Sequence, residues 1–327
     1  MADYHATEEY LKAVSAEAGI IIRNDEIDIA SFSDEPDYSH LLKDAPYYRD
    51  KVLALFSGMM ETNVFGIPPW GESKILYREG ETTAYTGINN SGKSLLIGQL
   101  MLWLARGGET AVIASMEMRP ERTIWRMVRQ LCGGENPSLR LINRAIDWLS
   151  GKIAIYEHLG TVKSQQMLAV TRYCASKGYR HILIDSLLKC GIREDDLDGQ
   201  KNFVDSLCAI GKAYPMHVHL VVHPRKPPEG MQHRPVSRFD MRGAGAISDQ
   251  MDNTMAVHRC TSKERELESP DLTDSYREEL LAKPDTLLIC DKQRNGEWTG
   301  TIPLWFDRPS MQFLPRRGRG LLEIMPI

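Results

Sequence analysis

Eight consecutive residues have the types and spacing that bind phosphate. They follow the pattern G-x-x-x-x-G-K-[ST] and are Gly87, Ile88, Asn89, Asn90, Ser91, Gly92, Lys93 and Ser94. In such a loop the glycines let backbone N–H groups approach phosphate oxygens, and the N-terminus of the following helix adds its positive end. Lys93 would neutralise the β- and γ-phosphates, and the hydroxyl of Ser94 would ligate Mg²⁺. The pattern predicts a site for ATP, or another NTP or dNTP, together with Mg²⁺.

Three polar residues could complete the chemistry of that site. Asp185, Glu117 and His223 each follow a short apolar run of the kind that forms a buried strand. Polar groups at the carboxyl ends of parallel strands lie in the crevice where α/β sheets bind ligands. Asp185 is therefore the candidate second metal ligand, and Glu117 is the candidate for orienting the attacking water. His223 could sense the γ-phosphate.

Each of these residues also has a local interpretation, which the sequence leaves open. Asp185 could cap the segment after its strand. Glu117 precedes a helix that we expect to begin at Pro120, where a negative charge is favourable through the helix dipole. A single histidine such as His223 is more often satisfied by local contacts than used as a sensor.

Alternating strands and helices must position these residues. The expected strands are 84–86, 111–114, 152–156, 181–184, 217–222, 254–257, 286–290 and 301–306, and the expected helices are 94–105, 120–131, 163–177 and 199–213. Short continuous apolar runs separated by helices of about 10–15 residues indicate strands that are buried on both faces. We therefore expect an α/β fold, a mostly parallel twisted sheet covered by helices on both faces.

Composition narrows the class of protein. The 327 residues are 42% hydrophobic and 26% charged, which is typical of a soluble globular protein. No stretch approaches the roughly 18 apolar residues of a membrane span, and the acidic start is unlike a secretory signal. The six cysteines form no CxxC pair, which argues against a disulfide framework or a zinc site. We expect a cytoplasmic protein.

Charge is spread unevenly along the chain. Residues 1–50 hold 12 acidic and 4 basic residues, a net charge of −8, which leaves +4 for residues 51–327. Any nucleic-acid contact would therefore be local and lie in the larger part. The acidic start is either a solvated segment or a docking site for a partner.

Two parts are predicted along the chain. Residues 1–65 would form a short acidic segment, with helices at 7–18 and 38–57, and residues 66–327 one larger domain. Within that domain, residues 261–284 are charged and carry two prolines. We expect them to form an inserted, mobile surface segment.

Read in order, six segments resemble the hexameric replicative helicases of the DnaB type, especially those of phages and mitochondrial Twinkle. They are Thr86 to Ser94, Ser115-Met116-Glu117-Met118, Ile184-Asp185-Ser186-Leu187, Val222-His223-Pro224-Arg225-Lys226, Arg242-Gly243-Ala244-Gly245-Ala246-Ile247 and Asp291-Lys292-Gln293-Arg294-Asn295-Gly296. The resemblance covers about residues 66–315 and implies a RecA-like P-loop NTPase core. It implies the helicase core only, because no primase domain or usual N-terminal helical domain fits before residue 60.

The resemblance also assigns roles at the nucleotide. Glu117 would polarise the attacking water, and His223 would be the γ-phosphate sensor. Lys292 and Arg294 would reach the γ-phosphate held by the neighbouring subunit, where an arginine finger can contribute about 10³–10⁵ in rate. A charged hairpin at Asn295-Gly296 is the alternative for these two residues. Arg259 and either Trp305 or Phe306 lie near the positions that stack on the base, although both aromatic residues could equally be core.

A second group of residues would contact DNA. Arg242, Gly243, Ala244 and Gly245 resemble the family's loop that faces the central channel and contacts single-stranded DNA, so we expect a loop here. Basic residues gather just before it, with a net charge of +3 over 224–242, and they are Arg225, Lys226, Arg234 and Arg238. Prolines and glycine indicate a loop, and contacts to phosphates suit a motor that tracks any sequence. A solvated loop is the alternative, and the acidic residues of 189–198 weigh against direct DNA contact by that neighbouring segment.

Together these features imply an ATP-dependent replicative DNA helicase. It would form a homo-oligomeric ring, expected to be hexameric, move 5′→3′ on single-stranded DNA and unwind the duplex. A helix at about 45–57 would be the linker helix that packs on the adjacent subunit, and a separate primase or polymerase could be a partner. The alternatives are a RecA-like recombinase or filament ATPase, and a non-unwinding ATP-switched DNA-binding accessory protein.

Overall fold

The structure is a computed structural model. It describes residues 21–22, 28, 46, 49–56, 64–71, 74–225, 234–318 and 320–326. The helix expected at 7–18 and the predicted DNA contact Lys226 lie outside the described residues.

The described strands form one large sheet and one small one. The large sheet has ten strands in the order β1-β6-β5-β7-β8-β4-β9-β10-β11-β12. Their bounds are β1 Ile21–Ile22, β4 Thr82–Thr86, β5 Ala111–Ser115, β6 Ile153–Tyr156, β7 His181–Asp185, β8 His217–Val221, β9 Asn253–Arg259, β10 Thr286–Gln293, β11 Gly300–Asp307 and β12 Gln312–Leu314. The pairs from β1 to β9 are parallel, and β10, β11 and β12 are added antiparallel. β2 (Val64–Gly66) and β3 (Tyr77–Arg78) form a separate antiparallel pair.

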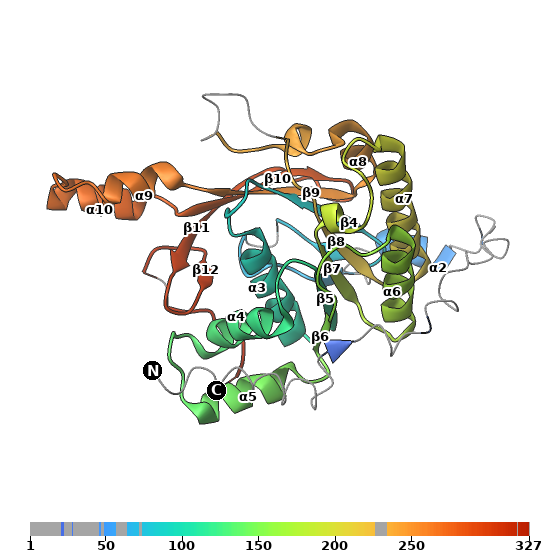
Figure 1. Ribbon diagram of the computed structural model, residues 1–327, viewed down its shortest axis with the longest axis horizontal. Helices are drawn as coiled ribbons and strands as arrows, with labels where there is room; N and C mark the ends of the chain where they lie inside the picture. The colour runs from blue at the N-terminus through green and yellow to red at the C-terminus, as the bar shows by residue number, and fades with distance from the viewer. Residues whose placement is uncertain are drawn as a thin grey trace.

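Helices cover both faces of the large sheet (Figure 1). Their bounds are α2 Arg49–Phe56, α3 Lys93–Arg106, α4 Pro120–Cys132, α5 Leu139–Leu149, α6 Ser164–Ser176, α7 Leu197–Ala213, α8 Ala244–Gln250, α9 Thr261–Leu267 and α10 Asp274–Ala282. Buried side chains of α3, α4 and α5 pack on one face, and those of α6, α7 and α8 pack on the other. The predicted α/β fold, a mostly parallel sheet covered on both faces, is confirmed.

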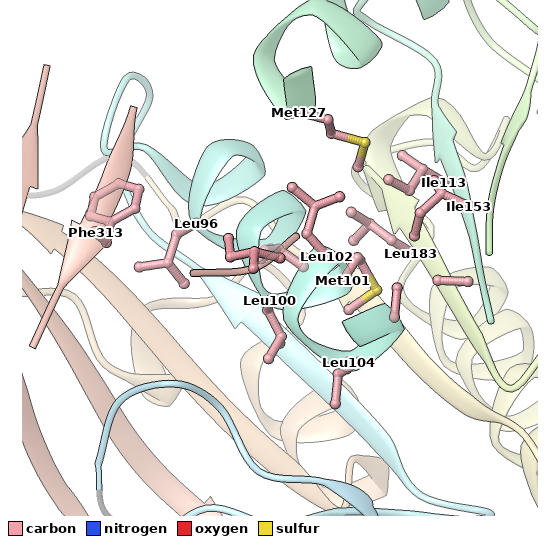
Figure 2. Packing of buried hydrophobic residues seen from close by; sticks show 14 of the residues in the cluster. Leu96, Leu100, Met101, Leu102, Leu104, Ile113, Met127, Ile153, Leu183 and Phe313 are labelled. Carbon is pink, nitrogen blue, oxygen red and sulfur yellow. The ribbon is translucent and has the colours of Figure 1, made fainter. Parts of the chain in front are cut away.

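Two hydrophobic clusters explain why the central strands are continuous apolar runs. In β5, Ile113 faces the α3 side, whereas Val112 and Ala114 face the α6 and α7 side. Figure 2 shows Met127 of α4 beside Ile113, and Leu100 of α3 in the same cluster on the first side. A strand that is covered on both faces has no solvent-facing position, so β5 is apolar up to its last residue, Ser115. Other central strands also bury polar residues, such as the threonines of β4 and the histidines of β8.

One helix that the sequence analysis did not predict is α5. Ser138 caps its N-terminus by accepting a hydrogen bond from the amide of Leu141, and its buried residues are Ile142, Ala145, Ile146 and Leu149. That spacing of i, i+3, i+4 and i+7 is the pattern of an amphipathic helix and was available in the sequence. α5 packs beside α4 over the same cluster.

The predicted insertion at 261–284 is folded. It forms the helices α9 and α10, which project together from the sheet on the left of Figure 1. The buried ammonium of Lys263 joins the base of this arm, because it donates to the carbonyl of Lys283 at 2.6 Å and to the Asp285 carboxylate at 2.6 Å. Charge and prolines predicted a mobile surface insertion without specifying these helices, and its mobility stays a prediction.

Two other expectations were incomplete. Ile21–Ile22 forms β1, a parallel neighbour of β6, although the sequence showed no strong strand pattern there. The helix expected at 45–57 is described as α2, Arg49–Phe56, with Val52 and Leu53 exposed. No helix among the described residues is long and apolar enough to cross a membrane.

Candidate functional site

The phosphate-binding pattern lies between β4 and α3, as its chemistry requires. β4 ends at Thr86, and α3 begins at Lys93. Gly87 has φ 155° and Gly92 has φ 88°, so both use backbone conformations that side chains disfavour. A Cβ at Gly87 would lie 2.4 Å from the carbonyl oxygen of Val257. The glycines are therefore required for the loop to fold back against β9.

Lys93 lies inside the loop that it would serve. Its Nζ donates to the carbonyl oxygens of Gly87 at 2.6 Å and Ile88 at 2.8 Å. The residue is 7% exposed, and this burial lowers the pKa of its ammonium. A buried cation with only carbonyl partners is well suited to an anionic ligand in the loop.

Ser94 and Asp185 form the pair of oxygen ligands that a magnesium site needs. The hydroxyl of Ser94 donates to Oδ2 of Asp185 at 2.5 Å. Burial raises the pKa of Asp185, and the hydrogen bond from Ser94 lowers it by less. A hydroxyl and a carboxylate at the N-terminus of α3 and the end of β7 fit the oxygen preference of Mg²⁺. The Asp185 side chain is bonded to Ser94, so the capping interpretation is not supported.

Sheet topology brings Glu117 to the same edge as Asp185. β5 and β7 are neighbours, with Ser115 paired to Asp185, and the amide of Met116 donates to the Asp185 carbonyl at 3.2 Å. The Glu117 side chain is 49% exposed, with Oε1 4.0 Å from Nζ of Lys189. The carboxylate thus faces the open cleft beside one lysine.

His223 lies between the phosphate loop and the basic segment that follows it. Burial lowers its pKa, and the nearby ammonium of Lys93 acts in the same direction, so the imidazole is favoured in its neutral form. The carbonyl oxygen of His223 accepts a hydrogen bond from the amide of Arg242 at 3.0 Å.

One open cleft of about 1620 Å³ contains most of the predicted site residues. Those that line it are Ile88, Asn89, Asn90, Ser91, Gly92, Lys93, Ser94, Glu117, Asp185, His223, Arg225, Arg242 and Arg259. The other described candidates do not line it, and they are Gly87, Arg234, Arg238, Gly243, Gly245, Lys292 and Arg294. The cleft therefore combines most of the predicted nucleotide residues with two predicted DNA contacts, Arg225 and Arg242.

Arg259 connects the end of β9 to the phosphate loop. Its guanidinium makes a bidentate ion pair with Glu264 of α9, at 2.7 and 2.8 Å, and Nη1 donates to the Asn90 carbonyl at 3.3 Å. Trp305 and Phe306 line the same cleft, and the Phe306 ring also lies 5.0 Å from that of Phe313. The aromatic residues thus border both the cleft and the core, so both interpretations of them remain open.

Lys292 and Arg294 contact the C-terminal end of α8. Nζ of Lys292 donates to the carbonyls of Ser248 at 2.8 Å and Asp249 at 3.1 Å. Arg294 pairs with Asp252 at 3.0 Å and donates to the Asp249 carbonyl at 3.0 Å. Cations at this end of a helix are stabilised by its dipole and unpaired carbonyls. Within one subunit these residues support α8 and do not reach the phosphate loop.

The described end of the basic segment, residues 234–242, contains a regular turn that the sequence did not indicate. Arg238 begins a short 3₁₀ turn that ends at Asp240, and Arg234 pairs with Asp240 at 2.5 Å. Gly243 adopts a left-handed conformation, φ 66°, just before α8. Ala244 and Gly245 belong to the first turn of α8, so the prediction that they lie in a loop was wrong.

One acidic residue of 189–198, Glu194, contacts this segment. The carboxylate of Glu194 lies against the guanidinium of Arg242, and Arg193 pairs with Asp195 at 2.8 Å. Gly243 and Gln200 of α7 are also close, since a Cβ on Gly243 would lie 3.1 Å from Oε1 of Gln200. The acidic segment therefore binds one of the predicted DNA contacts directly.

Two residues near the cleft were missed by the sequence analysis. Arg126 of α4 lines the cleft within electrostatic reach of Asp185, and Lys189 lies beside Glu117. Thr123, Arg126 and Gln130 share one face of α4, so a basic residue on an inward-facing stripe was the available signal for Arg126. Lys189 lies close to Glu117 because the strands before them, β7 and β5, are paired, and no local sequence pattern predicts this pairing.

Comparison with solved structures decides the fold family. No known family model matches the sequence, and no curated protein matches it. The ATPase domain of a phage helicase of the DnaB type superposes with a TM-score of 0.64 at 16% identity, covering 83% of this chain and 99% of that chain. This chain has the RecA-like fold of a DnaB-type helicase ATPase domain. A DnaB-like replicative helicase, solved in a study of its interactions with primase, superposes with a TM-score of 0.61 at 17% identity. That match covers 87% of this chain and 68% of the DnaB-like helicase chain.

Proposed function

We propose that this chain is an ATP-dependent replicative DNA helicase that works as a ring. ATP hydrolysis at subunit interfaces would drive 5′→3′ movement along single-stranded DNA and separation of the duplex. The observation that carries the proposal is the shared cleft, in which Lys93 and Asp185 lie with Arg225 and Arg242 and with His223 between the two groups. A phosphate-binding loop joined to a basic segment is the arrangement that an ATP-driven nucleic-acid motor needs.

The nucleotide site would use the residues of one subunit for binding. ATP supplies the transferable phosphoryl group, and Mg²⁺ neutralises charge on its β- and γ-phosphates. Lys93 would bind those phosphates, and Ser94 and Asp185 would hold the metal. Glu117 would orient the attacking water, and its exposure in the cleft leaves room for one. Lys189, 4.0 Å from Glu117, would hold that carboxylate in place by charge attraction.

The neighbouring subunit would complete the site. Lys292 and Arg294 lie outside the cleft of their own subunit, which supports a role in trans. Arg294 would stabilise charge that develops on the transferred phosphoryl group. Arg259 would lie on the base side of the nucleotide, because it contacts the carbonyl of Asn90 in the phosphate loop.

Residues from 225 to 245 would contact single-stranded DNA. Arg225, Arg234, Arg238 and Arg242 supply guanidinium groups, with Lys226 in the same segment. Gly243, Ala244 and Gly245 would offer backbone amides of the first turn of α8 to phosphates. The same segment joins His223 to α8, so a change at the γ-phosphate could move the DNA contacts directly.

The domain division is part of the proposal. Residues 1–65 would form the acidic segment with the linker helix at about 45–57, and residues 66–327 the ATPase domain. Exposed Val52 and Leu53 on α2 support packing of this helix on an adjacent subunit. The helicase would work in the cytoplasm, with a separate primase or polymerase as partner. The resemblance to a helicase studied with primase supports that partner class.

ATPase activity with and without single-stranded DNA tests the proposal. The proteins are wild type, Glu117→Gln, Arg294→Ala and a mixture of the two variants. DNA-stimulated hydrolysis should be lost in each variant and partly restored in the mixture, because mixed rings contain interfaces with both intact residues. A fork-unwinding assay then tests strand separation.

Other results would favour the alternatives. Activity that survives Arg294→Ala would contradict the trans role. A helical filament on DNA would favour the recombinase class, and ATP-dependent DNA binding without unwinding would favour the accessory class.

A further inference from the structure

Phe239 is the most exposed large hydrophobic residue in the described part of the chain. Its side chain is 70% exposed, in the 3₁₀ turn Arg238–Asp240. Its neighbours in that turn are an arginine and an aspartate. A phenylalanine in this position is not explained by the core, so the ring is available to a ligand.

The turn that carries Phe239 is held on both sides. Oδ2 of Asp240 accepts hydrogen bonds from the amide and the hydroxyl of Ser237, at 2.8 and 3.0 Å. The amide of Arg238 donates to Oδ2 of Asp291 in β10 at 2.8 Å. The amide of Arg225 donates to the Asp240 carbonyl at 2.7 Å. These bonds fix the backbone of the turn, so the ring is presented at low cost in conformational entropy.

One cation contacts the ring, and two more belong to the same short segment. The guanidinium carbon of Arg238 lies 4.8 Å from the Phe239 ring centroid. Arg234 pairs with the carboxylate of Asp240, the residue after Phe239, and the backbone amide of Arg225 donates to the Asp240 carbonyl. An exposed aromatic ring in an arginine-rich segment suits single-stranded nucleic acid, because bases stack on the ring while arginines contact phosphates.

We propose that Phe239 stacks on a base of the single strand whose phosphates the arginines of the same segment contact. This inference rests on the proposed function and adds a base contact to the phosphate contacts. Every base has a π-face, so the contact increases affinity without selecting a sequence. Asp240 lies one residue from Met241, which pairs with Pro224 in an isolated bridge beside His223. The bridge therefore connects the turn that carries Phe239 with the backbone next to His223, the candidate γ-phosphate sensor.

Binding to two oligonucleotides of equal length isolates the base contact. One is oligo(dT), and the other has the same backbone with abasic sites throughout. Wild-type full-length protein with Mg²⁺ and a non-hydrolysable ATP analogue should bind oligo(dT) more tightly. Phe239→Ala should weaken oligo(dT) binding about tenfold, since stacking contributes about 1–3 kcal/mol per base, and leave abasic binding unchanged. Phe239→Trp should restore the preference, whereas Phe239→Leu should not.

Leu139→Ala is the matched control. Leu139 is 66% exposed on α5, on the opposite face of the sheet from the Phe239 turn, so its loss should change neither affinity. Thermal unfolding of Phe239→Ala should match wild type, because an exposed ring contributes little to packing.

The outcomes separate this inference from the proposed function. Equal losses on both oligonucleotides would mean that the ring supports the turn or contacts another subunit, and would overturn the inference alone. A Phe239→Ala variant that still prefers oligo(dT) over the abasic oligonucleotide as strongly as wild type would also overturn the inference. If wild type binds neither oligonucleotide, both this inference and the proposed function fail.

Discussion

The amide of Arg242 donates a hydrogen bond to the carbonyl oxygen of His223 at 3.0 Å. His223 follows β8 and lines the cleft with the phosphate loop, and Arg242 lies just before α8. A movement of His223 would therefore be transmitted to the start of α8 through a backbone contact. A small shift of His223 would be enough to move the start of α8, because packed elements move as units.

His223→Ala should reduce the stimulation of ATP hydrolysis by single-stranded DNA at least tenfold, more than it reduces hydrolysis without DNA. The imidazole would report the γ-phosphate to the Arg242 segment, and alanine cannot make that contact. Steady-state hydrolysis over a range of oligo(dT) concentrations measures the stimulation, which is the ratio of the rates with and without DNA. Wild-type stimulation in the variant would refute the coupling.

Glu117→Gln should lower the turnover number about 10²–10⁴-fold and preserve nucleotide affinity, because the amide cannot polarise the attacking water. A fluorescent ATP analogue measures binding, and phosphate release measures turnover. Lys93→Ala is the contrasting variant and should lose nucleotide affinity itself. A Glu117→Gln enzyme with near wild-type turnover would place the water-orienting residue elsewhere.

Glu194→Gln should strengthen binding of single-stranded DNA about two- to fivefold, because it releases Arg242 from an ion pair and removes a negative charge near the strand. Titration of labelled oligo(dT) at low salt measures the effect, which should shrink as ionic strength rises. Asp195→Asn is the matched control, since Asp195 is in the same acidic segment and pairs with Arg193 instead. Equal gains in both variants would indicate only a general charge effect.

Three buried histidines should make stability depend on pH. His181, His217 and His219 are fully buried and in contact, with His181 Nδ1 3.1 Å from His219 Nε2. Burial lowers the pKa of all three, that of His217 to about 4, against about 6.5 in the unfolded chain. The unfolded state therefore binds more protons between pH 6.5 and 4, so stability is complete above that range and is lost as pH falls through it.

Thermal unfolding from pH 7.5 to 5 measures that loss. Each histidine contributes at most about 1.4 kcal/mol per pH unit. His219→Gln should lower Tm at pH 7.5, because Tyr85 and His181 contact His219, and should give a shallower dependence on pH than wild type. Parallel pH profiles for wild type and variant would show that other groups control acid stability.

Much of the nucleotide site could be predicted from the sequence because its signals are local. The phosphate loop is eight consecutive residues, and Asp185, Glu117 and His223 each follow an apolar run. A strand covered on both faces is mostly apolar, so the polar residue after an apolar run such as Ile182-Leu183-Ile184 marks the end of that strand. Apolar runs and their spacing also predicted the parallel sheet and the helices α3, α4, α6 and α7. They did not predict the helices α9 and α10 within 261–284, because these helices expose most of their surface and show no long apolar stripe.

Tertiary structure alone decided which of these residues meet. Strand order places β5, β7, β8 and β4 side by side, which gathers predicted residues from Ile88 to Arg259 into one cleft. It also placed Lys189 beside Glu117 and Glu194 against Arg242, and it left Lys292 and Arg294 at the end of α8. The sequence by itself determined the chemistry of each strand end and loop, because these depend on consecutive residues. Pairings across the sheet depend on crossover connections between distant segments, and no local pattern encodes them.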